Sequence, residues 1–350
     1  MEGNKFFFLY AFYLTFIMMI GSAIDACEYP KQVDNHLEKL FVFGDSFVDT
    51  GNLGKIGPLT RSWSFPYGIT FPRWPSGRFS DGRVLTDYIA SCMRIRSPIP
   101  YKYRKLGSKL LPYGMNFAVG GSGVFDTENL QKNLTTQIDV FEDQIRNSIF
   151  TQYDLHFSIA LVAISGNDYE YYRASGRPLN EISRFMDYLI SQLKVDLRRI
   201  HDLGVRKVVV TNMHPLGCTP FITRVSNYST CNTAYNSAVQ QHNQKLEAAV
   251  KELGKHTRRR SATFMSLDLY NPFQSIIQHG TRNLKNILKP CCQGKTNGTN
   301  CGERDDKGVK LYEVCSDPEE HFYWDSVHPT QAAWAAVFQA AEPSLCKIFM

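Results

Sequence analysis

The sequence predicts an α/β protein with a parallel sheet that is covered by helices on both faces. Short apolar runs alternate along the chain with segments whose apolar residues recur at helical spacing. The runs are continuously apolar, which is typical of strands buried on both faces of a parallel sheet. Polar residues and glycines gather where several runs end, as they do beside the ligand crevice of open α/β sheets.

Ser46 follows the first predicted strand. The run at residues 40–43 is rich in aromatic and β-branched residues, and Gly44 and Asp45 end it abruptly. A serine at this end of a strand faces the ligand crevice and is held by the backbone, as an acyl-transfer nucleophile must be. The alternative interpretation is an ordinary polar turn after a core strand.

A long loop is predicted over residues 51–82, which show no clear period. Loops of this length in a compact domain are usually functional. Its aromatic residues either line a pocket or anchor the loop; they are Trp63, Phe65, Tyr67, Phe71, Trp74 and Phe79. Asp81 is then expected to cap a helix over about residues 83–92.

The remaining elements continue the alternation. Strands are predicted at about residues 115–119, 157–164, 205–211 and 262–269, and helices at about 134–148, 182–200, 235–253, 272–278 and 331–341. Asn180 is expected to be the N-cap of the helix at 182–200, and Gly204 is expected to end it. His242 lies on an apolar helical stripe, and we interpret it as a packed or rim histidine rather than a ligand. No repeat and no linker is visible.

Polar groups at three strand ends and in one late loop are expected to converge. Ser46, the glycine turn at 120–121 and Asn167 each follow a predicted strand, and Asp325 and His328 lie near the C-terminus. In a right-handed doubly wound sheet these junctions share one edge. Acyl transfer needs a serine, an imidazole, a carboxylate and donors for the developing oxyanion.

Several sequence blocks resemble the plant branch of the GDSL-type esterases and lipases, also called SGNH hydrolases. In order, they are FGDS with DTGN at 43–52, GRFSDGR at 77–83, NFA with two glycines at 116–121, GND at 166–168, and WD with HPT at 324–330. The resemblance implies a three-layer α/β/α doubly wound parallel sheet, flavodoxin-like, in one domain over residues 27–350.

The resemblance also implies a role for each candidate residue. Ser46 would be the nucleophile, His328 the general base and Asp325 its orienting acid. The oxyanion would be held by the backbone N–H groups of Ser46 and Gly121 and by the Asn167 side-chain amide, with Gly120 as the alternative to Gly121. The implied activity is hydrolysis of acyl esters through an acyl-enzyme, without a metal or cofactor.

Two features qualify the resemblance. Phe47 stands where the family name implies leucine, and we expect it to face the core or a pocket wall without changing the chemistry. The G-x-S-x-G motif is absent, and Asp325 and His328 lie only three residues apart, which argues against the common α/β-hydrolase fold.

Three other functions remain open. The same triad could serve an acyltransferase or a polysaccharide O-deacetylase, and the chain could be an inactive wall-binding module. The expected partner is a small-molecule or lipid ester, with cell-wall acyl esters among the candidates, and the oligomeric state is left open. The net charge of +6 is modest, and the basic run at 255–260 is interpreted as a solvated helix end, so no nucleic-acid partner is expected.

The N-terminus and the cysteines indicate secretion. Lys5 precedes an apolar run at 6–20, and small residues follow up to Ala26, so residues 1–26 are predicted to be a signal peptide. The alternative is a signal anchor, although the run is shorter than the ~20 residues of a membrane span. We expect no stable membrane insertion.

The nine cysteines include no C-x-x-C pair, which favours disulfides over a zinc site. Their pairing stays open, but the polar segment at 291–315 is expected to be disulfide-bonded. Asn133, Asn227 and Asn297 are N-glycosylation acceptors in a secreted chain.

Overall fold

The computed structural model describes residues 39–349, except for 55–59, 107, 128–131, 256–262 and 297. The predicted signal peptide, most of the basic run at 255–260 and the acceptor Asn297 therefore lie outside the described residues.

Six parallel strands form the sheet in the order β2–β3–β1–β4–β5–β6. They are β1 (Lys39–Gly44), β2 (Ile99–Pro100), β3 (Gly114–Asn116), β4 (Ser158–Ala163), β5 (Lys207–Thr211) and β6 (Phe264–Leu267). β1 pairs with β3 through Val42 and Asn116 and with β4 through Val42 and Leu161. The strand order reverses beside β1, so the ligand crevice of a doubly wound sheet opens there. The predicted fold class is confirmed, and among the described strands of this sheet only the two-residue β2 was not predicted.

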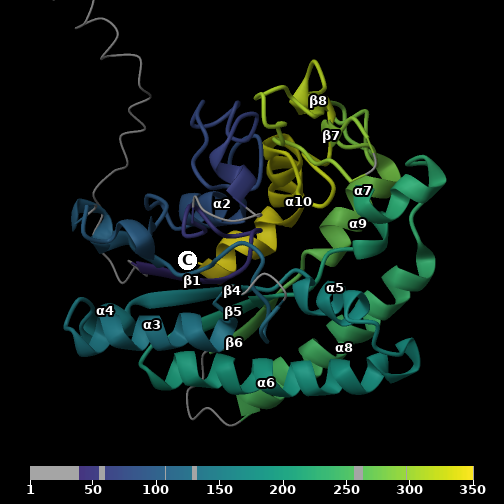
Figure 1. Ribbon diagram of the computed structural model, residues 1–350. Coiled ribbons are helices and arrows are strands. Elements are labelled where there is room, and N and C mark those ends of the chain that lie inside the picture. Colours follow the sequence, from purple (N-terminus) through teal and green to yellow (C-terminus); the bar gives the residue numbers. More distant parts are fainter. Residues whose placement is uncertain are drawn as a thin grey trace, which may run out of the picture. The chain divides into compact units, whose positions relative to one another are not determined.

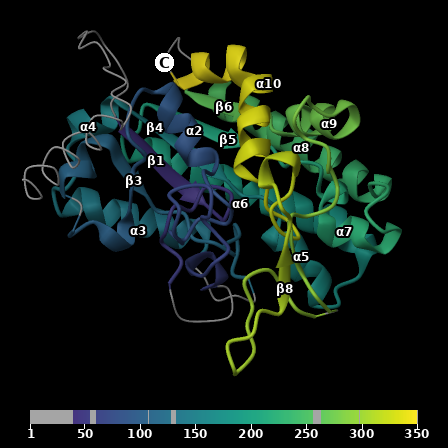
Figure 2. The same ribbon diagram turned by 90° about the horizontal axis from the view of Figure 1, so that it is seen from above.

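Helices form a layer on each face of the sheet (Figure 1). One layer contains α2 (Leu85–Cys92), α9 (Tyr270–His279) and α10 (Gln331–Phe349), which share one core; α2 and α10 lie over the strands in Figure 2. The other contains α3 (Leu134–Arg146), α4 (Gln152–His156), α6 (Ile182–Asp202) and α8 (Thr233–Lys255).

β1 contributes to both layers because its side chains alternate between the two faces. Leu40 and Val42 belong to the core beneath α2 and α10. Phe41 and Phe43 belong to the opposite core, where the Phe41 ring lies 4.7 Å from the ring of Phe141 in α3. Burial on both faces explains why this strand is continuously apolar.

Two predicted helix caps are wrong. Asp81 does not cap α2, whose first turn is closed by Asp87 accepting from the Val84 backbone N–H at 2.9 Å. Asp81 instead accepts from the N–H of Gln331 at the start of α10. Asn180 lies in a short 3₁₀ helix before α6, and Glu181 takes the N-cap position without a side-chain hydrogen bond.

Other local predictions agree with the structure. Gly204 follows the C-cap of α6 with a φ of +118°. His242 is buried on α8, where its Nδ1 lies 2.8 Å from the Tyr169 hydroxyl, as expected for a packed histidine.

Four disulfides join the described cysteines: Cys92–Cys346, Cys218–Cys231, Cys291–Cys315 and Cys292–Cys301. The prediction that the segment at 291–315 is disulfide-bonded is confirmed. This segment contains a hairpin of β7 (Cys292–Gly294) and β8 (Tyr312–Val314). Cys92–Cys346 connects α2 to α10 across 254 residues of sequence.

A buried carboxylate with one oxygen that accepts no hydrogen bond from the described residues lies between α6 and α3. Asp196 is 1% exposed, and its Oδ1 accepts from Thr135 at 3.0 Å and from Gln192 at 3.3 Å. Its Oδ2 has no hydrogen-bond partner among the described residues. Burial therefore raises the pKa of Asp196 from 3.8 to about 6.

We predict that Asp196→Asn stabilises the protein at neutral pH. The folded protein holds this proton more tightly than the unfolded chain, so the stability linked to it is complete below about pH 4 and is lost as pH rises through about 6. The variant should gain up to ~3 kcal/mol in free energy of unfolding at pH 7 and little at pH 4. Denaturant unfolding at both pH values measures this. Asp202→Asn, at an exposed position of the same helix, is the control and should keep the wild-type pH dependence.

Candidate active site

Ser46, His328 and Asp325 form a continuous chain of contacts. His328 Nε2 lies 2.8 Å from Ser46 Oγ, and His328 Nδ1 lies 2.8 Å from both carboxylate oxygens of Asp325. All three residues are buried. The structure thus brings together residues that the sequence separates by up to 282 positions.

The end of β1 fixes the place of Ser46. Gly44 has a φ of +136°, and a Cβ there would come within 1.9 Å of the Ala163 carbonyl oxygen of β4. Only glycine fits this approach. Gln137 of α3 pairs its side-chain amide with both the N–H and the carbonyl of Gly44. The chain then turns sharply, with Asp45 Oδ1 accepting from the Phe47 N–H.

Asp325 organises the turn that carries His328. Its Oδ1 accepts from the backbone N–H groups of Val327 and His328, each at 2.9 Å. Burial alone would raise the pKa of Asp325, but the charge interaction with His328 and these hydrogen bonds outweigh it and lower the pKa to about 2. Asp325 is therefore an anion at neutral pH.

The glycine turn after β3 offers one free backbone donor, the N–H of Gly121, among the described residues. The N–H of Gly120 donates to Asp49 Oδ2 at 3.0 Å. Among the described residues, the N–H groups of Ser46 and Gly121 have no hydrogen-bond acceptor. This geometry favours Gly121 over Gly120 as a donor to a bound anion.

Asn167 begins α5 (Asn167–Ala174), which follows β4 after residues 164–166, with Gly166 at its N-cap position. Its Nδ2 donates to the Ser122 carbonyl at 2.8 Å and to Asp45 Oδ2 at 3.2 Å. The amide is thus tethered to the neighbour of Gly121 on one side and to the neighbour of Ser46 on the other. Asp45 Oδ2 also accepts two shorter bonds, both of 2.6 Å, from Ser165.

The aromatic loop both packs and projects outward. Tyr67 and Phe79 are buried, and the Phe79 ring stacks on His328 at 4.7 Å. Phe65 and Trp74 are 50% and 62% exposed. The anchoring interpretation therefore holds for Tyr67 and Phe79, and the pocket-lining interpretation stays a prediction for Phe65 and Trp74.

Two residues near the site were not identified from the sequence. The Tyr67 hydroxyl donates to Asp325 Oδ2 at 2.7 Å, a contact across 258 residues that no local pattern signals. His214 follows the end of β5, and that position was the available signal. Its ring stacks on Phe47 at 4.6 Å, and burial together with the charge of His328 lowers the pKa of His214 to about 3. Phe47 itself is a core residue that also packs on Trp334.

The two described glycosylation acceptors differ in their surroundings. Asn133 is the N-cap of α3, accepting from the Thr136 N–H and donating to Asp126. Asn227 is exposed, with a φ of +51°.

Across the described ranges, no group of three or more His, Cys, Asp and Glu residues has the arrangement of a metal site. None of the helices in the described residues is long and apolar enough to cross a membrane.

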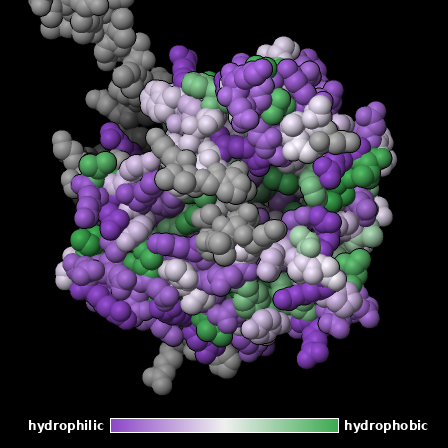
Figure 3. Space-filling view, viewed as in Figure 1, coloured by the Kyte–Doolittle hydropathy of each residue, from purple (hydrophilic) through white to green (hydrophobic). Residues whose placement is uncertain are grey.

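Figure 3 shows hydrophobic side chains in separate patches among hydrophilic ones on one face of the molecule.

Known proteins resemble the chain over most of its length. The family described as GDSL-like lipase/acylhydrolase matches residues 40–341. Two GDSL esterase/lipases of Arabidopsis thaliana are each 44% identical; the matches cover 97% of this chain and of one relative, and 89% of this chain and of the other. Among solved structures, an acetylxylan esterase of Geobacillus stearothermophilus is 12% identical and covers 88% of this chain and 94% of its own, with a TM-score of 0.41.

Proposed function

This chain belongs to the GDSL-like lipase/acylhydrolase family and is a carboxylic ester hydrolase, and we propose that it is a secreted enzyme that forms an acyl-enzyme on Ser46. The observation that carries the proposed mechanism is the contact chain from Ser46 Oγ through His328 to Asp325. Its substrates are proposed to be small-molecule esters, in keeping with the family.

In the first half-reaction, Ser46 Oγ attacks the ester carbonyl carbon while His328 Nε2 takes the hydroxyl proton. Asp325 accepts the hydrogen bond from Nδ1 and stabilises the imidazolium that forms. His328 then returns the proton to the departing alkoxide, which leaves as the alcohol. The acyl group remains bound to Ser46 as an ester.

In the second half-reaction, water attacks the acyl carbon and His328 takes its proton. The tetrahedral intermediate collapses, the proton returns to Ser46 Oγ and the carboxylic acid leaves. His328 must be neutral at the start of both halves, so activity should fall on the acid side of its profile.

The negative charge on the carbonyl oxygen is proposed to be stabilised by three donors. The backbone N–H groups of Ser46 and Gly121 are unoccupied by the described residues, and the Asn167 amide is tethered between their neighbours. Uncharged donors in a buried site stabilise a developing anion without needing counter-ions of their own.

Secretion is supported by the four disulfides, since such bonds persist in oxidising compartments. We propose that residues 1–26 are the signal peptide and that the mature enzyme begins after them as one domain. Asn227, Asn133 and Asn297 are its proposed glycosylation positions.

We predict that Ser46→Ala abolishes ester hydrolysis and covalent labelling by a fluorophosphonate, because no other group carries the acyl chain. Circular dichroism and the melting temperature should remain close to those of the wild type. Labelling of the folded variant at another serine would show that Ser46 is not the nucleophile.

We predict that Asn167→Ala lowers kcat by ~10²–10³, the usual effect of removing one oxyanion donor, with little change in KM. The matched control is Ser165→Ala, which removes a different side-chain donor to the same Asp45 oxygen. The control should change stability more than kcat. If Asn167→Ala lowers only the melting temperature, the amide merely supports the turn.

A further inference from the structure

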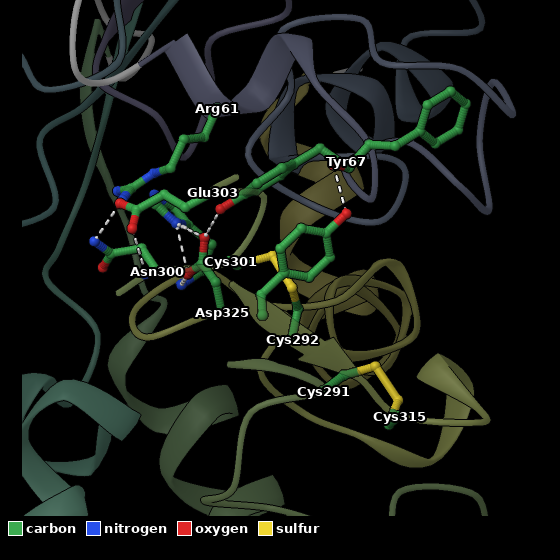
Figure 4. Close-up of a disulfide and its surroundings, with 12 residues drawn as sticks. Arg61, Tyr67, Cys291, Cys292, Asn300, Cys301, Glu303, Cys315 and Asp325 are labelled. Carbon is green, nitrogen blue, oxygen red and sulfur yellow. Dashed lines mark hydrogen bonds and ion pairs between the residues drawn. A yellow bond between two sulfur atoms is a disulfide. The ribbon is translucent and has the colours of Figure 1, made fainter. Parts of the chain in front are cut away.

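Tyr67 is the one side chain besides His328 that hydrogen-bonds to Asp325 within the described residues. Asp325 Oδ1 accepts from the backbone N–H groups of the 325–328 turn, Oδ2 accepts from the Tyr67 hydroxyl at 2.7 Å, and both oxygens lie 2.8 Å from His328 Nδ1. Figure 4 shows the tyrosine pointing toward the carboxylate from the opposite loop. The rotation of the carboxylate about its Cβ–Cγ bond is therefore held at both oxygens.

The Tyr67 ring is itself held on several sides. It is 1% exposed and packs edge-on against Phe79 at 5.9 Å and against Trp324 at 6.1 Å. A Cβ added at Gly302 would lie 3.3 Å from its Cε2, so the backbone of the cystine-containing segment also borders the ring. Trp324 directly precedes Asp325, so the same contacts fix both partners of the hydrogen bond.

The cystine-containing segment is tied to the aromatic loop. Glu303 forms an ion pair with Arg61 at 3.0 Å and accepts two bonds from Asn300 (Figure 4). The adjacent Cys301 is bonded to Cys292, whose N–H donates to the Trp324 carbonyl at 2.7 Å. The segment that borders Tyr67 is thus held by an ion pair to the aromatic loop and by a disulfide to Cys292, which is hydrogen-bonded to Trp324 next to Asp325.

We propose that Tyr67 is a positioning residue for ester hydrolysis, acting through Asp325. By donating to Oδ2, the hydroxyl fixes the carboxylate against His328 and withdraws part of its charge from the imidazole. Tyr67 does not touch the reacting atoms. The inference rests on the proposed Ser46–His328–Asp325 mechanism.

The hydroxyl remains a donor over the working pH range. Burial and the charge of Asp325 raise the pKa of Tyr67 well above its ordinary value. The other charged groups that act on this tyrosine are Arg61 and Glu303, which form an ion pair with each other. Asp45 and His214 are the further titratable groups that interact with His328.

The test compares Tyr67→Phe with Tyr312→Phe. Tyr312 is also buried between the two loops, but its hydroxyl donates to the Phe65 carbonyl at 3.0 Å instead of to Asp325. Tyr67→Phe should lower kcat by roughly tenfold with KM nearly unchanged, as expected for losing one hydrogen bond to a charged group. It should also move the acid limb of the pH–rate profile to higher pH, by up to ~1 unit. Without the hydrogen bond from Tyr67, more of the negative charge of Asp325 acts on His328 and stabilises its imidazolium form.

Tyr312→Phe should lower the melting temperature without moving the acid limb. The inference is overturned if Tyr67→Phe keeps the wild-type kcat and pH profile, or if both variants lose kcat equally with an unmoved limb. Ser46→Ala, assayed alongside, tests the proposed mechanism separately from the role of Tyr67. A hydrolytically active Ser46→Ala would remove the proposed mechanism itself, whereas an inactive one leaves a negative Tyr67 result to count against the inference alone.

A second substitution covers the case in which Tyr67→Phe does not fold. A ring-fluorinated tyrosine at position 67 keeps the packing and the hydroxyl but makes the phenol a stronger donor. It should move the acid limb in the opposite direction, to lower pH. An unmoved limb in this folded variant would also overturn the inference.

Discussion

The parallel pairing of β1 with both β3 and β4 is the constraint on which the remaining structure depends. The register places Val42 opposite Asn116 on one side and Leu161 on the other, so the three strands end at the same edge of the sheet. The segments that follow them then have to pass one another closely. Buried carboxylates join them: Asp49 accepts from Gly120 across 71 residues, and Asp45 accepts from Ser165 across 120.

The strands and long helices could be predicted because their signal lies in the order of apolar residues along a short window. β1 and β4 are apolar at nearly every position, and α6 and α8 repeat their apolar residues at helical spacing. β2 escaped detection because two residues cannot show a period. Asp81 and Asn180 were misassigned because a capping side chain accepts from whichever N–H the fold brings near it, and for Asp81 that is 250 residues away.

The residues of the candidate site also fall into those that the sequence could predict and those that it could not. Ser46, Asn167 and the glycine turn could be singled out because each follows a strand. Gly121 was preferred to Gly120 only through the family resemblance, because the contact that occupies the Gly120 N–H, with Asp49, is a tertiary one. Tyr67 meets the site only through tertiary packing and stands in no local pattern that distinguishes it from an ordinary core residue, whereas the position of His214 after β5 was a usable signal.

The separation of Ser46 from His328 by 282 residues has a consequence for biosynthesis. The strand that carries the proposed nucleophile is translated well before the turn that carries the proposed base. A nascent chain interrupted before residue 325 contains the serine but lacks both of its partners, and Cys92 still lacks Cys346. Under the proposed mechanism such a chain carries a serine without its base, so ester hydrolysis has to wait until the turn at 325–328 has been made and folded.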